Sequence, residues 1–132
     1  MMHIESPRTG DQALEAEIKS KGLTAPRITP ADIEANIASE HYFIAADAID
    51  SDLNATSIHH DGLNGFIPES LELLTFCVLV LRNGFTATGE SACASPENFD
   101  ADLGRKIARE NAVNKIWPLM GYELKTRLAA IK

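Results

Sequence analysis

Two arginines, Arg105 and Arg109, are four positions apart in a segment whose composition favours a helix, so they lie side by side on one helix face. Two like charges at this spacing cost roughly a few tenths of a kcal/mol, and a compensating anion is expected. The guanidinium group forms paired, planar hydrogen bonds with phosphate, so the pair predicts a site for a phosphate-bearing ligand. The alternative is ion pairing with nearby acids, such as Asp102 or Glu110, which is common and weak on protein surfaces.

Small hydroxyl residues precede this helix, in the segment TGESACASPEN of residues 88–98. Thr88, Ser91 and Ser95 supply hydroxyls, and their small neighbours let backbone amides approach a ligand closely. Ser95 and Asn98 are placed where the helix should begin, which favours anions. Taken alone, each of these two residues is better explained as a helix cap. The predicted ligand site therefore combines six residues: Arg105, Arg109, Thr88, Ser91, Ser95 and Asn98.

The sequence offers little for catalysis or metal binding. It has no nucleophile elbow, no His-Glu-x-x-His motif and no phosphate-binding Walker loop. His59, His60 and Asp61 are adjacent and have no second ligand cluster at a suitable spacing, so no metal site is expected. We therefore expect a binding protein that is not an enzyme and carries no cofactor.

Charge is distributed unevenly along the 132 residues, whose net charge is -7. Residues 1–100 contain 5 Lys or Arg against 16 Asp or Glu, whereas residues 101–132 contain 7 against 3. This asymmetry predicts a local anion site and argues against general nucleic-acid binding. The N-terminus lacks a signal peptide, and the longest apolar run, residues 73–81, is too short to span a bilayer. A cytoplasmic protein without membrane contact is expected.

The clearest structural signal is a β-hairpin over about residues 74–93, because Asn83 and Gly84 separate two β-prone runs. A two-residue loop would place Cys77 opposite Glu90 and Cys93 opposite Leu74, which predicts two reduced thiols. The first strand is apolar on both faces. Helices would cover one face, and a partner subunit is the simplest cover for the other.

Helices are expected to flank this hairpin. One should run from Asp11 to about residue 21, and another should begin at Thr29 with a capping box. A helix over about residues 99–116, capped by Ser95 or Asn98, should break or kink at Pro118 before a short final helix. Residues 41–49 favour a strand and residues 50–70 a long loop. The prediction is an α+β fold with a small antiparallel sheet, in one domain over residues 11–132 after a disordered segment of residues 1–10.

Three blocks carry a resemblance to a known family: KGLTAPRITPADIE, the stretch of residues 74–112, and KIWPLMGYELK. The chain resembles the small phage-protein family named after gene 49 of a lytic coliphage and gene 66 of a Shigella phage, over about residues 12–130. Residues 41–62 depart from the shorter members. The chain is also similar to Thoeris anti-defence proteins of the first type. That resemblance implies an oligomer, dimeric or hexameric, which sequesters cyclic ADP-ribose isomers or cyclic oligonucleotides without cleaving them, through Arg105 and Arg109.

Two functions follow as alternatives. The first is an anti-defence sponge for a cyclic nucleotide signal of Thoeris or of cyclic-oligonucleotide (CBASS) immunity. The second is a host-takeover protein that binds a host protein or DNA through its basic C-terminal helices. Salt dependence separates them, because DNA binding weakens steeply with salt whereas a ligand enclosed in a small pocket is far less sensitive.

Overall fold

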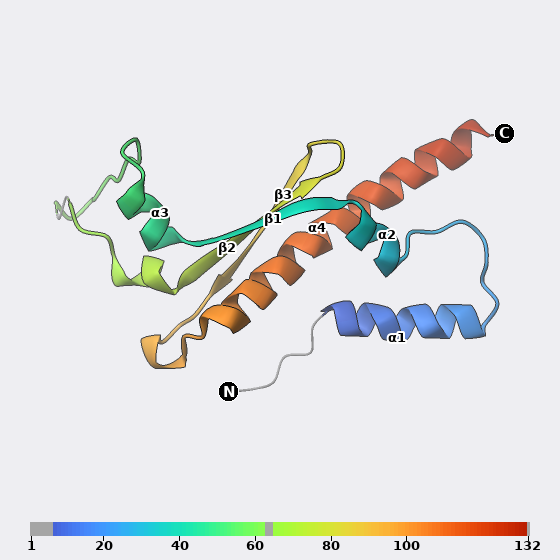
Figure 1. Cartoon of the computed structure of the whole chain (residues 1–132), viewed down its shortest axis with the longest axis horizontal. Coiled ribbons are helices and arrows are strands. Elements are labelled where there is room, and N and C mark those ends of the chain that lie inside the picture. The colour runs from blue at the N-terminus through green and yellow to red at the C-terminus, as the bar shows by residue number, and fades with distance from the viewer. Residues whose placement is uncertain (1–6, 63–64, 132) are drawn as a thin grey trace.

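A three-stranded antiparallel sheet, crossed on one face by a long C-terminal helix, forms the centre of the chain (Figure 1). The computed structural model describes residues 7–62 and 65–131. The strand order is β1-β2-β3, and the α+β class expected from the sequence is confirmed. The elements are α1 (Pro7–Ser20), α2 (Pro30–Ala35), β1 (Ile37–Ile44), α3 (Ala45–Ser51), a 3-10 helix (Glu69–Leu73), β2 (Leu74–Leu81), β3 (Thr86–Ala92), a 3-10 turn (Pro96–Asn98) and α4 (Ala101–Ala130).

The expected hairpin is present, but its register differs by one residue from the prediction. Cys77 pairs with Gly89 instead of Glu90, and Leu74 pairs with Ala92. The reason is the turn: Leu81 N–H donates to the Phe85 carbonyl, which leaves a three-residue loop. Gly84 ends this loop with a φ of 89°, a conformation that favours glycine. Both cysteines are free thiols, as predicted.

The two faces of β2 have different surroundings. Thr75, Cys77, Leu79 and Leu81 are buried towards α4, because the antiparallel pleat directs alternate side chains to one face. The intervening residues, including Phe76, are only half-buried. On this second face Phe43 of β1 stacks on Phe76 with ring centroids 5.4 Å apart. Because β2 is apolar on both faces and α4 covers only one of them, the side away from α4 keeps an apolar surface.

Helix α4 crosses the sheet as one continuous helix of 30 residues (Figure 1), so the predicted separate final helix after Pro118 is wrong. Proline removes one backbone hydrogen-bond donor. Pro118 lies on the exposed side of the helix, where water can satisfy the carbonyl that loses its partner.

Close packing of α4 on β3 depends on Gly89, because a Cβ there would lie 2.3 Å from the Ala108 carbonyl oxygen and from the Ala112 nitrogen.

The N-terminal elements attach beside the sheet. The capping box predicted at Thr29 is present: its hydroxyl accepts from the Asp32 N–H at 3.1 Å, and the Asp32 carboxylate accepts from the Thr29 N–H at 2.9 Å. Helix α1 begins at Pro7, so residues 7–10, which were expected to be disordered, belong to it; residues 1–6 lie outside the described residues. Arg27 forms a two-pronged ion pair with Glu15 and joins the link before α2 to α1.

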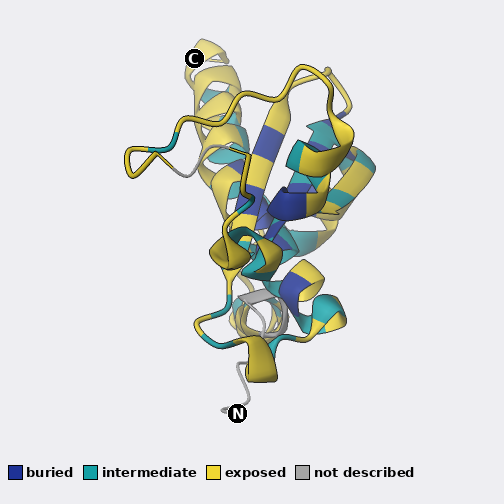
Figure 2. Cartoon of the chain, turned by 90° about the vertical axis from the view of Figure 1, so that its left-hand side faces the viewer, coloured by how far each residue is buried: buried dark blue, intermediate teal, exposed yellow. Residues whose placement is uncertain are grey.

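The strand expected over residues 41–49 lies earlier in the chain. It starts at Ile37 and ends at Ile44, after which α3 continues to Ser51. The predicted long loop is confirmed for the described residues between Asp52 and Pro68, which form turns and irregular backbone. This loop and α3 lie at the end of the molecule opposite the C-terminus of α4 (Figure 1), and the loop surface is largely exposed (Figure 2).

Candidate functional site

The start of α4 is capped by a residue that the sequence analysis did not select. Asp100 accepts a hydrogen bond from the Leu103 N–H at 3.0 Å, so Asp100 is the N-cap. Ser95 instead donates to the Glu97 carboxylate at 3.0 Å and makes no side-chain cap contact. Asn98 ends the 3-10 turn that precedes the helix. The predicted capping by Ser95 or Asn98 is therefore wrong, and a different explanation is needed for both side chains.

A cavity of about 250 Å³ lies between the end of β3 and the first turns of α4. Ser91 and Asn98, two of the six predicted ligand residues, line it together with Cys93 and Gly104. The half-buried thiol of Cys93 lies 3.2 Å from the Ser95 carbonyl oxygen. The cavity places hydroxyl, amide and thiol groups beside the N-terminus of a long helix, where exposed N–H groups favour a negatively charged ligand.

Arg105 borders a second cavity, of about 210 Å³, on the other side of the same helix turns. Its guanidinium pairs with Asp102, the local acid that the ion-pairing alternative proposed, and its side chain is 45% exposed. Tyr42 and Thr75 line this cavity as well. The Oγ1 of Thr75 is buried and has no hydrogen-bond partner among the described residues. Arg105 is thus accessible, and its ion pair with Asp102 is itself exposed.

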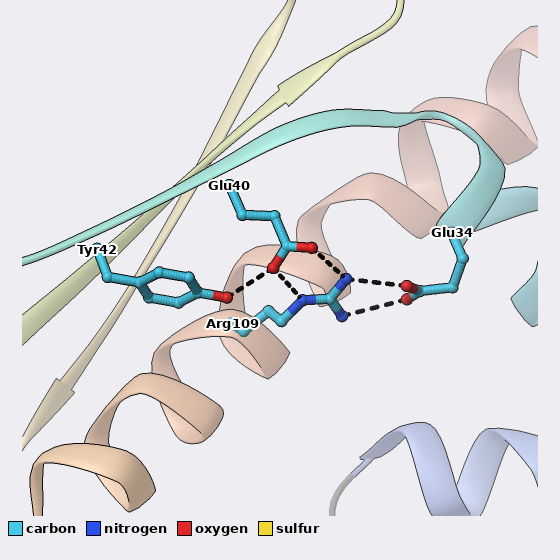
Figure 3. A network of polar contacts seen from close by, with 4 residues as sticks. All are labelled: Glu34, Glu40, Tyr42 and Arg109. Atoms are coloured by element: carbon cyan, nitrogen blue, oxygen red, sulfur yellow. Dashed lines mark hydrogen bonds and ion pairs between the residues drawn. The ribbon is translucent and has the colours of Figure 1, made fainter.

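Arg109 is one turn further along α4 than Arg105, and its side chain lies among Glu34, Glu40 and Tyr42 (Figure 3). Its Nε donates to Glu40 at 2.7 Å, and its two terminal nitrogens donate to the Glu34 carboxylate at 3.1 and 2.9 Å. A further bond of 3.2 Å joins it to Glu40, which also accepts from the Tyr42 hydroxyl at 2.7 Å. The side chain of Arg109 is only 14% exposed. The two arginines are one turn apart on α4, but only Arg105 is largely accessible.

Glu34, Glu40 and Tyr42 were missed because they are far from Arg109 in the chain. Glu34 precedes it by 75 positions and Glu40 by 69. The sequence signal that bears on Glu34 was the capping box at Thr29, because it marks the start of the short helix that carries Glu34. The pairing of β1 with β2, which places Glu40 opposite Leu79 on the face towards α4, supplies the second acid. Only the packing of α4 on that face brings the two acids to the guanidinium.

Burial changes the acid–base properties of two groups beside this network. The pKa of the Tyr42 hydroxyl is raised, chiefly by burial and then by its hydrogen bond to Glu40. Burial also raises the pKa of the Cys77 thiol, to about 11 from an ordinary value of 9.0. Both groups are therefore neutral near pH 7. Two carboxylates face the guanidinium of Arg109 and accept four of its hydrogen bonds, so a ligand anion competes there with Glu34 and Glu40.

The six predicted residues do not meet in one place, and Ser95 pairs with Glu97 outside both cavities. Ser91 and Asn98 share one cavity, and Arg105 borders the cavity on the other side of the helix. Arg109 is in the carboxylate network. Thr88 is exposed on the sheet face away from α4, because Ala87 and Gly89 on either side of it point towards the helix. Their role in ligand binding stays a prediction.

Within the part of the chain that the structure describes, no group of three or more His, Cys, Asp or Glu residues is placed to hold a metal ion. The described helices include none that is long and apolar enough to cross a membrane.

Comparison with known families defines the class of this protein. A long helix packed on a hairpin-centred sheet occupies most of residues 28–128, and this range matches the model of the Phage protein (N4 Gp49/phage Sf6 gene 66) family. The chain belongs to that family, as its motifs predicted. Helix α1 lies before the matched region. No match was found among curated proteins or among solved structures.

Proposed function

We propose that this phage-family protein is a non-enzymatic, cytoplasmic sponge that holds, without cleaving it, a phosphate-bearing cyclic nucleotide signal of bacterial immunity. A cyclic ADP-ribose isomer or a cyclic oligonucleotide is the expected ligand, which would make the protein an anti-defence factor against Thoeris or CBASS. The observation that carries the proposal is the pair of cavities on either side of the first turns of α4, one with Ser91 and Asn98 and the other with Arg105.

The two cavities suit a ligand with separate polar parts. Each is smaller than the roughly 300–1,000 Å³ usual for a pocket that encloses a drug-sized ligand, at about 250 and 210 Å³. One cavity therefore accommodates a phosphate-ribose unit or a base, and a complete cyclic nucleotide requires more surface. Arg105 is the accessible cation, and Arg109 becomes the second one when a ligand phosphate replaces a carboxylate.

A second copy of the chain is the proposed source of the additional surface. The face of the sheet away from α4 carries the half-buried residues Phe76, Val78 and Val80 and the exposed Phe43. An apolar face of this kind is stabilised by burial against a partner, and sheets stack face to face about 10 Å apart. We propose a homo-oligomer, dimeric or hexameric, in which this face is covered.

The test is release of unchanged ligand. The protein is incubated with a cyclic ADP-ribose isomer or with a cyclic trinucleotide, freed of unbound ligand, and heated to denature it. Mass spectrometry should recover the intact cyclic compound in an amount close to that of the protein. A linear product would identify an enzyme, and recovery of neither compound would contradict binding of these two signal classes.

Matched arginine variants locate the site. Arg105→Ala should weaken ligand binding by about tenfold or more, because a charge-assisted hydrogen bond to phosphate contributes roughly 1.5–3 kcal/mol. Arg127→Ala is the control, since Arg127 is on the same helix, is exposed and pairs with Glu123 in a local ion pair. If the wild type, Arg105→Ala and Arg127→Ala bind the ligand with equal affinity, the ligand site does not include Arg105.

The rival function, binding of DNA or a host protein through the basic C-terminal part of α4, predicts a different result. Duplex DNA at physiological salt should then be bound tightly, and the affinity should fall steeply as salt increases. A gel-shift titration across salt concentrations decides between the two functions, because ligand binding in cavities around α4 should change much less.

A further inference from the structure

Helix α1 lies at the margin of the fold, beside the sheet and α4 (Figure 1). None of residues 10–20 is buried, and only three of them are half-buried. Leu14, one helical turn before Ile18, is 60% exposed. Residues 21–26, which follow the helix, are all exposed. The helix therefore has little of the apolar burial that stabilises most helices in folded proteins.

Space remains between α1 and the body of the protein, which is formed by the described residues from 27 onwards. A cavity of about 360 Å³ lies between α1, residues 27–30 and α4, and Leu14, Ile18 and Trp117 are among the side chains that line it. A second cavity, of about 500 Å³, lies between α1 and the start of α2. Close-packed elements leave few voids larger than a water molecule between them. Helix α1 is therefore not close-packed on the body.

An ion pair bridges α1 and the body between these two cavities. The guanidinium of Arg27 donates to both oxygens of the Glu15 carboxylate, and one of the two hydrogen bonds is 2.7 Å long. Both residues line both cavities. The Arg27 and Glu15 side chains are only 28% and 15% exposed. A two-pronged pair with this little solvent contact holds its partners more firmly than an exposed ion pair does.

The body has a buried core of its own. That core joins α2, the sheet and α4 through residues such as Ile33, Leu79 and Ile116, and no described residue of α1 belongs to it. Helix α2 begins with its own capping box at Thr29. The region that the family model matches also starts after α1, at residue 28. The sheet and α4 can therefore stay packed while α1 moves.

We propose that α1 is a hinged arm, which opens about residues 21–26 while the sheet and α4 stay folded, and that the Glu15–Arg27 ion pair is the latch that holds it closed. Opening uncovers Ile28 and Trp117, which line the cavity under the helix. Elements held by few buried contacts open locally at a lower free energy than the whole protein unfolds. The inference does not depend on the proposed ligand.

Hydrogen exchange of backbone amides, resolved by residue, tests the arm and its latch. In the wild type, the amides of α1 should exchange at least about tenfold faster than those of β2. Glu15→Gln should raise α1 exchange by about a further tenfold, because a charge-assisted pair is lost, and should leave β2 and α4 unchanged. Glu17→Gln is the matched control, since Glu17 is on the same helix and makes an exposed pair with Lys21 at 3.0 Å. It should have little effect.

Charge reversal separates the latch from other effects of changing Glu15. Glu15→Arg places two cations together, so it should open the arm further than Glu15→Gln does. Adding Arg27→Glu restores an ion pair of reversed sign and should return α1 exchange towards the wild-type rate. Trp117 is the single tryptophan of the sequence, and acrylamide should quench its fluorescence more in Glu15→Arg than in the wild type or the double variant.

Three outcomes would overturn the proposal. If α1 and β2 exchange at the same rate in the wild type, α1 opens only when the whole protein unfolds. If Glu15→Gln and Glu17→Gln have equal effects on α1, the ion pair with Arg27 is not the latch. If the charge-reversed double variant exchanges as fast as Glu15→Arg, pairing of these two side chains does not hold the arm.

Discussion

Glu40 of β1 and Arg109 of α4 are 69 positions apart in the sequence and are joined by two hydrogen bonds, of 2.7 and 3.2 Å (Figure 3). Glu34 holds the same guanidinium from α2. One side chain therefore connects the long helix to the edge strand and to the short helix before it. A residue predicted from its neighbours as a ligand contact also has a structural role, and the two roles can be measured separately.

Replacing Arg109 by alanine should lower the free energy of unfolding by about 1–3 kcal/mol, because two carboxylates lose their shared partner. Chemical denaturation measures this loss. Arg105→Ala is the control and should change stability by less than about 1 kcal/mol, since its single pair with Asp102 is exposed. Ligand affinity measured on the same two proteins reports binding independently. An unchanged denaturation midpoint in Arg109→Ala would show that the network adds nothing to stability.

Gly89→Ala should destabilise the protein strongly. The added methyl group would meet the backbone of α4 at 2.3 Å, and backbone cannot move aside as a flexible side chain does. We expect a loss of about 2–4 kcal/mol, in the upper part of the range for overpacked sites. Gly121→Ala on α4 is the matched change, because nothing lies within 4 Å of its Cβ position. It should stabilise the helix by roughly 0.5–1 kcal/mol. Equal melting temperatures for the two variants would contradict the close packing of α4 on β3.

Thr75→Val should raise stability by about 1 kcal/mol, because it replaces a buried hydroxyl, which has no hydrogen-bond partner among the described residues, with a methyl group of similar shape. Thr88→Val is the comparison on the next strand, at an exposed position, and should have little effect on stability. Thermal unfolding of both variants measures the difference. A destabilised Thr75→Val would mean that the hydroxyl has a partner in solution, such as a buried water molecule.

Stability should decrease at alkaline pH because of Cys77. The folded protein favours the neutral thiol, whose pKa is raised to about 11 from 9.0. Its contribution is complete below pH 9 and is lost as the pH rises from 9 towards 11, since the unfolded thiol releases its proton first. Denaturation is best compared at these pH values in a Tyr42→Phe background, because the raised pKa of Tyr42 acts in the same direction. Adding Cys77→Ala should reduce the pH dependence. If the pH dependence is equal with and without the Cys77 thiol, the loss of stability at alkaline pH does not come from Cys77.

Local signals were sufficient for several elements. The pair Asn83-Gly84 located the hairpin, and Thr29 with Asp32 located the start of α2, because turn and cap residues act within a few positions. The family could also be identified from sequence blocks. The exact hairpin register was wrong by one residue, because a two-residue and a three-residue loop differ only in the conformation of the turn.

The remaining features depend on tertiary structure. Pro118 was expected to break or kink the helix. Helix α4 instead continues past Pro118 despite the lost hydrogen bond. Its face with Ala108 and Ala112 packs closely on Gly89 of β3, and this packing holds the helix in place. The partners of Arg109 come from two elements more than sixty positions earlier, so its local neighbours could not reveal them. The sequence by itself determined where charge and hydroxyl groups lie along the chain. Only the packing of α4 on the sheet decided which of them meet, since that packing brings distant carboxylates to one guanidinium and leaves the other exposed.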